Sequence, residues 1–460
     1  MRTIKTIPES HIAGREREIK RLLSYLGEGD CCSVVGMSNV GKSELLCAAY
    51  QFAVRPQDFP ESKGAYMLVY IDLNLMLEMT EQGFYEIIIR SLLTEMQNHR
   101  DDVGLRERIS QSYESIVNPK SEFLISHAFN QALTTFVQEW TPGVVLFFDE
   151  FDHPFATIEG RVFLNLRALR DRYGHRMLYV TATCRRLHEI RGGRDAGEYC
   201  ELFTHQTVYL PPLKEPHARV LIDDFIQDEH IPFDAQEIEL ILSHADGHPA
   251  LLESACYVMS RMKSEEKSIS LSPRFRQERL QERLDSDQAI HFECAKLWLD
   301  LSPNERKTML ACVALNETPD PEIMTSLEQL YLLRETSDGT RPFCSLFQSF
   351  VRRRRFDQRA ESRGIRIDVE AGSVQVDGVL VPPLTELEYR LLLLLYGHLD
   401  QICDKYSIVE AVWGVEYIDE VDDARIEKLV SRLRQKVEPN PSQPSYLLTV
   451  RGRGYRLVSQ

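Results

Sequence analysis

The sequence predicts a multidomain protein: an α/β domain comes first, helical and mixed segments follow, and a small α+β domain ends the chain. Three observations predict this. At 460 residues the chain exceeds one ordinary core, since domains typically hold roughly 100 to 200 residues. Apolar runs alternate with helical patterns in the first half, which is typical of a parallel sheet. After Gly364, short alternating strands and Gly turns flank three helical patterns.

Composition and charge narrow the function classes. With 43% hydrophobic and 27% charged residues the chain is globular, and its net charge of -16 excludes nucleic-acid binding over the whole surface. Any DNA site must therefore be local. The ten cysteines form no CxxC pair of zinc spacing, so we expect reduced thiols. No apolar run has the length of a signal peptide or a membrane span, so we expect a cytoplasmic protein without a membrane partner.

A phosphate-binding loop is predicted at residues 36–43, GMSNVGKS. The GxxxxGK[ST] spacing lies between an apolar strand, Cys31–Val35, and a helical pattern that starts at Glu44. Glycines let backbone N–H groups turn toward phosphate oxygens, Lys42 suits the terminal phosphates, and Ser43 suits Mg²⁺. The alternative is a chance glycine loop. The residues expected to bind ATP or ADP are Gly36, Ser38, Asn39, Val40, Gly41, Lys42, Ser43 and Glu44.

A second acidic strand, GVVLFFDEFD, ends in Asp149 and Glu150. Ligands bind at the carboxyl ends of strands in open α/β sheets. Asp149 is expected to hold Mg²⁺, and Glu150 to orient or deprotonate the attacking water. An acidic strand end that merely faces solvent is the alternative.

Two further apolar runs complete the predicted sheet, GAYMLVYIDLNLM after the loop helix and RMLYVTATCRRL after the acidic strand. The second run brings Thr181, Thr183 and Arg185 to a strand end. Arg185 or Arg186 either senses the γ-phosphate or is a surface cation, and we assign the catalytic role to Arg185.

HIAGREREIKRLL, before the loop, resembles the entry segment of STAND and archaeal-type AAA+ ATPases. That resemblance implies that Gly14 and Arg15 lie near adenine and ribose. The alternative is that residues 15–18, RERE, are only a charged first helical turn. Residues 1–210 would form the nucleotide-binding domain and 211–285 a helical lid. Gly247-His248-Pro249 resembles the GxP element of the lid, where Pro249 packs on adenine, or it is a plain helix start.

Residues 286–352 resemble the winged-helix domain that follows the lid in STAND ATPases, although the His-Asp pair that senses nucleotide in that family is absent. We expect a linker at 353–363, since the segment is polar and lacks apolar periodicity. The basic run Arg352–Arg355 either contacts DNA phosphates or is a solvated helix end.

The C-terminal segment 364–460 combines strands, three helices and a final hairpin. Thr385 should cap a helix with an apolar stripe of Leu387, Leu391, Leu392 and Leu395. The third helix should bury Ile426, Leu429, Val430, Leu433 and Val437 and leave a basic face, which suits a helix in the DNA major groove. The glycines of VRGRGY allow a tight turn that presents arginines to a minor groove.

LTELEYRLLLLL, SRLRQKVEP and TVRGRGYRL resemble the OmpR/PhoB winged-helix family in order and spacing. The resemblance implies double-stranded DNA as a partner, and it implies that the loop 414–421 faces RNA polymerase. The expected DNA-binding residues are Arg425, Lys428, Ser431, Arg432, Arg434, Lys436, Thr449, Arg451 and Arg453.

Together these patterns predict a transcription regulator switched by ATP and ADP, with slow hydrolysis and nucleotide-dependent self-association. The alternatives are an initiator-like or DNA-remodelling AAA+ enzyme, a defence ATPase that detects DNA, and a protein in which nucleotide is a static structural ligand.

Overall fold

The computed structural model forms two compact units, residues 1–351 and 352–460. It describes residues 14–54, 66–98, 103–141, 143–265, 273–313, 319–336, 339–362, 364–368, 373–377, 379–382, 384–414, 421, 423–450 and 452–458. Each unit has its own buried apolar cluster, and each is described below by itself.

The first unit is built on a five-stranded parallel sheet with the strand order β2-β3-β4-β1-β5. The strands are β1 (Cys32–Val35), β2 (Met67–Asp72), β3 (Val144–Asp149), β4 (Met177–Thr183) and β5 (Thr207–Tyr209). Every residue of β1, β3 and β4 is buried, which explains why these strands are continuous apolar runs instead of alternating patterns.

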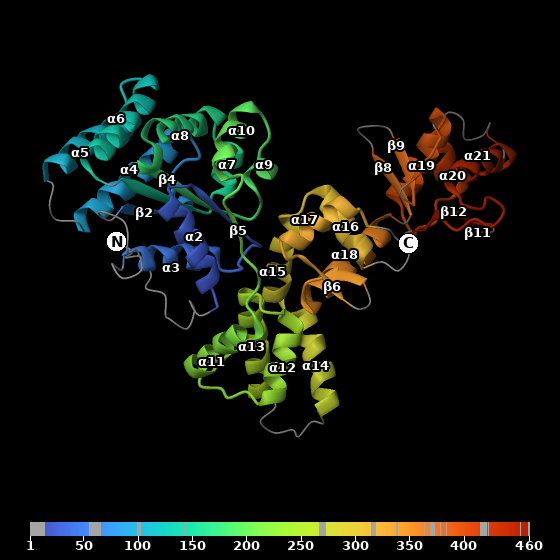
Figure 1. The fold of residues 1–460 in the computed structure, drawn as a ribbon. Coiled ribbons are helices and arrows are strands. Elements are labelled where there is room, and N and C mark those ends of the chain that lie inside the picture. The colour runs from blue at the N-terminus through green and yellow to red at the C-terminus, as the bar shows by residue number, and fades with distance from the viewer. Residues whose placement is uncertain are drawn as a thin grey trace. The chain divides into compact units, whose positions relative to one another are not determined.

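Helices cover the sheet, with α2 and α3 on one side of it and α8 and α10 on the other (Figure 1). These helices are α2 (Glu16–Glu28), α3 (Lys42–Val54), α4 (Glu81–Asn98), α5 (Val103–Val117), α6 (Phe123–Glu139), α7 (Asp152–Thr157), α8 (Gly160–Tyr173), α9 (Leu187–Ile190) and α10 (Arg194–Cys200). Helix α3 starts at Lys42, so the lysine of the predicted phosphate loop is its first residue.

Helices and one hairpin complete the first unit, and the last of these helices, α18, continues into the first residues of the second unit. The helices are α11 (Glu215–Glu229), α12 (Ala235–Ala245), α13 (Pro249–Glu265), α14 (Pro273–Ser286), α15 (Gln288–Leu299), α16 (Pro303–Cys312), α17 (Pro321–Gln329) and α18 (Ser345–Ser362). The hairpin pairs β6 (Leu333–Thr336) with β7 (Gly339–Pro342) in antiparallel register. Two of these helices begin with reciprocal capping pairs, Asp234 with Glu237 and Ser302 with Glu305.

Helix α18 continues through residues 353–362. The segment that we predict to be the linker is therefore helical over most of its length. The absence of apolar periodicity indicates that a segment lacks a core-facing stripe, but it does not exclude a helix, and the run of arginine, glutamine and alanine has good helix propensity.

The second unit has a three-stranded antiparallel sheet, three helices and a final hairpin. Its elements are β8 (Ile365–Asp368), β9 (Ser373–Val376), β10 (Val379–Leu380), α19 (Glu386–Gly397), α20 (Lys405–Val412), α21 (Asp423–Val437), β11 (Leu447–Val450) and β12 (Gly454–Leu457). All five predicted core positions of α21 are buried. On α19, Leu391, Leu392 and Leu395 are buried, but Leu387 is 38% exposed, so the apolar stripe begins one turn later than predicted.

In the part of the chain that the structure describes, no helix is long and apolar enough to cross a membrane. The ten cysteines are all free thiols, and seven of them are buried.

Candidate nucleotide site and nucleic-acid interface

The predicted phosphate loop connects β1 to α3 at the carboxyl edge of the sheet. Gly41 has a φ of +103°, a conformation that favours glycine. A Cβ at Gly36 would lie 2.9 Å from Val40 Cγ1 and 3.0 Å from Leu210 Cβ, so Gly36 is needed for close packing. The loop thus has the strand–loop–helix setting that phosphate binding requires.

Lys42 is buried, and its ammonium has three protein partners. Nζ donates to the carbonyl oxygens of Gly36 and Met37, at 3.0 Å each, and to Cys184 Sγ at 3.3 Å. Burial alone would lower the pKa of Lys42, but the Cys184 sulfur and the Asp152 carboxylate outweigh it and raise that pKa. The ammonium therefore stays charged, and because it has only three protons it must give up a present contact to bind a phosphate.

The side chains of Ser43 and Asp149, which we predict to hold Mg²⁺, are in hydrogen-bonding contact. Burial raises the pKa of Asp149, and hydrogen bonds from the hydroxyls of Tyr70 and Ser43 oppose that rise. The Tyr70 hydroxyl donates to Asp149 Oδ2 at 2.5 Å. No group of three or more His, Cys, Asp or Glu among the described residues could hold a metal ion alone. A hydroxyl and one carboxylate fit Mg²⁺ that takes its other ligands from phosphates and water.

The acidic strand end carries two more carboxylates. Glu150 is exposed and has a φ of +56°, which is uncommon for a residue with a side chain and is often found at functional sites. Asp152 was not predicted: its carboxylate accepts hydrogen bonds from the backbone N–H of Cys184 at 2.8 and 3.1 Å. Burial raises the pKa of Asp152 to about 6.

Arg15 is 5% exposed, so it is not part of a solvated charged turn. Its guanidinium donates to the carbonyl oxygens of Val40 at 2.8 Å and Pro211 at 2.6 Å. Burial lowers the pKa of Arg15 to about 10, which leaves it charged at neutral pH. Gly14 has a φ of +93° and lies against the His217 ring. Glu44 is exposed in the first turn of α3.

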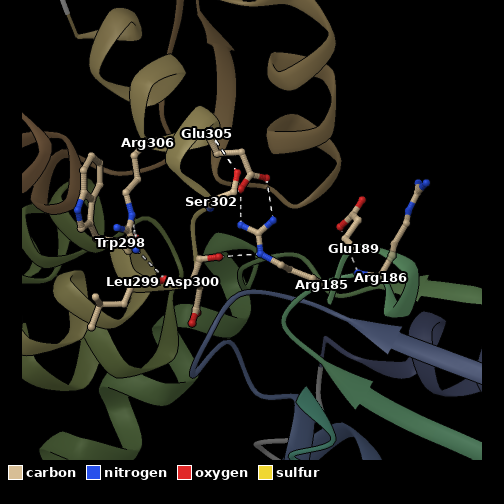
Figure 2. A network of polar contacts seen from close by, with 9 residues as sticks. All are labelled: Arg185, Arg186, Glu189, Trp298, Leu299, Asp300, Ser302, Glu305 and Arg306. Carbon is tan, nitrogen blue, oxygen red and sulfur yellow. Dashed lines mark hydrogen bonds and ion pairs between the residues drawn. The ribbon is translucent and has the colours of Figure 1, made fainter. Parts of the chain in front are cut away.

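Arg185 is mostly buried, and its guanidinium bonds residues of the segment that follows α15. NH1 donates to Glu305 Oε1 at 3.0 Å and NH2 to Glu305 Oε2, while Nε donates to the Asp300 carbonyl oxygen at 2.6 Å (Figure 2). Arg186 bonds the Tyr209 hydroxyl and, at 2.7 Å, Gln329 Oε1. Both arginines therefore connect the sheet to the segment α15–α17.

The same segment contacts the phosphate loop directly. Ser38 Oγ donates to Asp300 Oδ2 and Asn39 Nδ2 to Glu293 Oε2, each at 2.6 Å. A small pocket lies at this junction, lined by Met37, Cys184, Arg185, Leu297, Asp300, Leu301, Leu330 and Leu332. The loop side chains are thus bonded to carboxylates of the chain itself.

His248 contacts the loop, and Pro249 is the first residue of α13. Nε2 of His248 lies 2.9 Å from the Ser38 carbonyl oxygen, which can only accept, so Nε2 carries the proton. His248 is fully buried, and burial lowers its pKa to about 4. A neutral His248 therefore holds α13 against the loop backbone.

In the second unit, α21 presents four of the predicted DNA-binding residues on its exposed side, opposite its buried stripe. These are Arg425, Lys428, Ser431 and Arg432.

Two other residues that are predicted to contact DNA form hydrogen bonds within the protein. Arg434 donates twice to the Leu447 carbonyl oxygen, at 2.9 and 2.7 Å, and at 2.8 Å to Thr449 Oγ1. Lys436 donates to Glu388 Oε2 at 2.8 Å. Arg434 therefore connects α21 to the hairpin β11–β12.

The final hairpin has the tight turn that its glycines predict. Gly452 has a φ of +71° and Gly454 one of +133°, and a Cβ at Gly454 would lie 2.1 Å from the Cys403 carbonyl oxygen. Arg453 is exposed at the turn. Arg451 and residues 415–420 of the expected polymerase-facing loop lie outside the described residues.

Sequence reasoning missed the carboxylates that contact the loop and Arg185 from the α15–α16 segment. Glu293 and Asp300 carry no motif. Ser302-Pro303-Asn304-Glu305 is a capping-box pattern, and Ser302 N indeed donates to Glu305 Oε2 at 2.7 Å. That local role accounts for the glutamate fully, so nothing in the sequence pointed to its second partner, Arg185.

The comparisons agree with the two-unit division. Residues 381–457 match the family described as "Transcriptional regulatory protein, C terminal". The alkaline phosphatase synthesis transcriptional regulatory protein SphR of Synechococcus elongatus is 35% identical over 125 residues, which is 26% of this chain and 47% of SphR. The sensory transduction protein RegX3 of Mycobacterium leprae is 38% identical over 99 residues, or 22% and 48% of the two chains. The chain spans just under half the length of these relatives.

Among solved structures, the Walker-type ATPase PABY2304 of Pyrococcus abyssi resembles 74% of this chain, with 95% of its own length covered, 14% identity and a TM-score of 0.45. The strand order β2-β3-β4-β1-β5, with the phosphate loop after the fourth strand of that order and acidic residues after the second, is the AAA+-like arrangement. Residues 381–457 of the C-terminal unit thus match the transcriptional regulatory C-terminal family and have the winged-helix arrangement of OmpR/PhoB-type domains, and this unit is joined in one chain to a body with an AAA+-like fold.

Proposed function

We propose that this chain is a transcription regulator switched by ATP and ADP, which binds double-stranded DNA through its C-terminal winged helix. The observation that carries the proposal is the contact of Arg185 with Glu305. It connects the strand end beside the phosphate loop to α16, and the chain runs from α16 through α18 into the DNA-binding unit. A change at the nucleotide site can therefore pass by packed contacts to α16, and the chain connects α16 covalently to the DNA-binding unit.

Nucleotide binding is implied by the AAA+-like fold and assigned here to the loop 36–44. Backbone N–H groups at the start of α3 would hold phosphate oxygens, and Lys42 the terminal phosphates. We assign Gly14, Arg15 and Pro249 to the adenosine part of the nucleotide. The buried Arg15, bonded to Val40 of the loop, supports that assignment because it already fixes the loop against the helical segment.

Mg²⁺ is assigned to Ser43 and Asp149, whose hydrogen bond brings the two oxygen ligands together. When bound, Mg²⁺ would neutralise phosphate charge during hydrolysis. Glu150, exposed at the strand end, would orient or deprotonate the attacking water. Because Lys42 and Arg185 are both held by protein partners, we expect hydrolysis to be slow and to reset the switch.

DNA binding is assigned to the exposed face of α21 and to the hairpin turn. Arg425, Lys428, Ser431 and Arg432 would enter the major groove. The turn with Arg451 and Arg453 would reach a minor groove or the backbone. Arg434, Lys436 and Thr449 would act at the edge of this surface, where Arg434 fixes the hairpin to the recognition helix. The loop 414–421 is assigned to RNA polymerase.

We assign the body to the STAND type of AAA+-like ATPase, with α16, α17 and the hairpin β6–β7 as a second winged helix. Two helices followed by an antiparallel hairpin support this assignment. The proposed domains are residues 1–210, 211–285, 286–352 and 364–460, with the helical connection 353–363. The nearby division of the two compact units, between residues 351 and 352, supports the boundary.

ATP would favour an open, self-associating state and ADP a closed monomer. Self-association would matter because one winged helix makes few phosphate contacts. Two linked winged helices on adjacent DNA sites bind more tightly, since the second one is held at a high effective concentration.

The test is DNA binding by the full chain in ADP and in a non-hydrolysable ATP analogue, together with its mass in solution. We expect the ATP analogue to tighten sequence-selective binding and raise the mass, and Lys42→Ala to abolish both effects. Lys20→Ala, an exposed lysine of α2, is the matched control and should behave as the wild type. Equal mass and equal DNA affinity with both nucleotides would refute the switch.

A further inference from the structure

Arg185 lies at the centre of the contact between the sheet and the α15–α16 segment. It forms a bidentate pair with Glu305 and a third hydrogen bond with the Asp300 carbonyl oxygen (Figure 2). The side chains of Arg185 and Glu305 are only 16% and 8% exposed. A bidentate guanidinium–carboxylate pair uses the same donor geometry that a guanidinium presents to a phosphate. Glu305 therefore occupies the donors that a phosphate would need.

Glu305 is fixed and charged in this position. Besides Arg185, it accepts the backbone N–H of Ser302 at 2.7 Å. Burial acts to raise the pKa of Glu305, but the hydrogen bonds from Arg185 and Ser302 outweigh burial and lower it. The pair is therefore ionised at neutral pH, and removal of either partner would leave a buried charge unpaired.

Arg185 is also close to the lysine of the phosphate loop. Cys184, the preceding residue, contacts Lys42 at 3.3 Å, and Thr183 Oγ1 donates to the Arg185 carbonyl oxygen at 2.6 Å. The backbone that carries the arginine is thus held beside the ammonium that we assign to the terminal phosphates.

We infer that Glu305 sets the discrimination between ATP and ADP, because it competes with the γ-phosphate for the guanidinium of Arg185. ATP must break the pair before its γ-phosphate can use those donors, whereas ADP leaves the pair intact. Glu305 thus weakens ATP binding relative to ADP, and the arrival of a γ-phosphate releases α16. This inference rests on the proposed nucleotide binding and adds the residue that reads the third phosphate.

The loop contacts have a different consequence, which separates the two effects. Asp300 and Glu293 bring carboxylates to Ser38 and Asn39 of the phosphate loop, so they oppose any phosphate bound there. That opposition acts on ADP and ATP alike. Asp300 holds Arg185 through its backbone carbonyl, so Asp300→Asn would remove the carboxylate charge without removing the contact to Arg185.

The experiment measures dissociation constants of ADP and a non-hydrolysable ATP analogue, with Mg²⁺, for the full chain by titration calorimetry. Glu305→Gln is suitable because glutamine keeps the capping acceptor. We expect it to tighten binding of the ATP analogue about tenfold, the size of a charge-assisted hydrogen bond, and to change ADP binding less than about twofold. Asp300→Asn should tighten both nucleotides by similar factors. Glu322→Gln, an exposed glutamate of α17, should change neither.

A double variant tests whether Glu305 acts through Arg185. In an Arg185→Ala background, Glu305→Gln should no longer alter the ratio of the two dissociation constants, since the competed group is gone. An unchanged ratio in Glu305→Gln, with both nucleotides still bound, would overturn this inference and leave the proposed function standing. If neither nucleotide bound to the wild type or to any variant, with thermal unfolding showing folded protein, the proposed function would fall and this inference with it.

Discussion

The two units hold the cations that we assign to nucleotide and to DNA in different ways. In the AAA+-like body, Lys42 and Arg15 are 7% and 5% exposed, and they and Arg185 donate to partners within the protein. In the winged-helix unit, Lys428 and Arg432 are exposed on α21. The cations that we assign to phosphate in the body must break existing bonds to reach a ligand, whereas Lys428 and Arg432 are already exposed. Two further predicted DNA-binding cations, Arg434 and Lys436, are bonded within their unit.

The difference teaches how each ligand is selected. A phosphate in the body must replace buried hydrogen bonds, so geometry and competition decide what binds. DNA meets exposed charges through a long-range field that salt screens, so electrostatics decides affinity and base contacts decide sequence. Three experiments would break or sharpen this comparison, from the largest expected effect to the smallest.

The largest effect concerns the separate cores. Leu391 is 0% exposed in the core of the second unit, and Leu391→Ala should cost that unit about 2 to 5 kcal/mol of unfolding free energy. In calorimetry of the full chain, only the transition of the winged-helix unit should move down in temperature. Leu387→Ala on the same helix, at 38% exposure, is the control and should have a small effect. Equal shifts of both transitions would contradict two separate cores.

A smaller effect concerns the buried histidine. An unfolded histidine has a pKa of about 6.5, whereas burial lowers that of His248 to about 4. Between these values the unfolded chain binds a proton that the folded chain refuses, so stability falls as pH falls through that window. The body should lose on the order of 2 kcal/mol between pH 7 and pH 4.5 through this residue.

His248→Asn should remove that part of the pH dependence, as followed by the unfolding temperature of the body against pH. His230→Asn is the matched control, because His230 is exposed and asparagine tolerates its left-handed backbone. If the wild type and His248→Asn had parallel profiles, the neutral hydrogen bond to the loop would be the wrong description.

The smallest effect concerns one exposed cation of the winged-helix unit. Arg432→Ala should weaken DNA binding by about 1 to 2 kcal/mol, within the range of one side-chain contact to a base pair. If Arg432 contacts a phosphate instead, the slope of log affinity against log salt should fall by about 0.9 and sequence preference should persist. Fluorescence anisotropy over a salt series distinguishes the two. An affinity equal to that of Lys20→Ala would remove Arg432 from the interface.

Much of this molecule follows from local patterns. The strand–loop–helix around Lys42 and the burial of Ile426, Leu429 and Leu433 follow from spacing and periodicity, because both signals repeat within one element. The error at Leu387 lies at a helix end, where periodicity does not say which turn first meets the core. For residues 353–363 the sequence pattern predicted a linker without saying whether it is helical, and the helix found there is consistent with the propensity of its residues.

By itself, the sequence determined the two folds, the order of the units, and the residue types available to phosphate and DNA, because these depend on short-range spacing and composition. Only the tertiary structure decided which residues far apart in the sequence form hydrogen bonds and ion pairs with each other. Arg185 and Glu305 are 120 residues apart, and Glu305 already had a complete local role as a capping residue. No local pattern encodes such a pairing, since it arises only when packing brings two distant elements to one buried site.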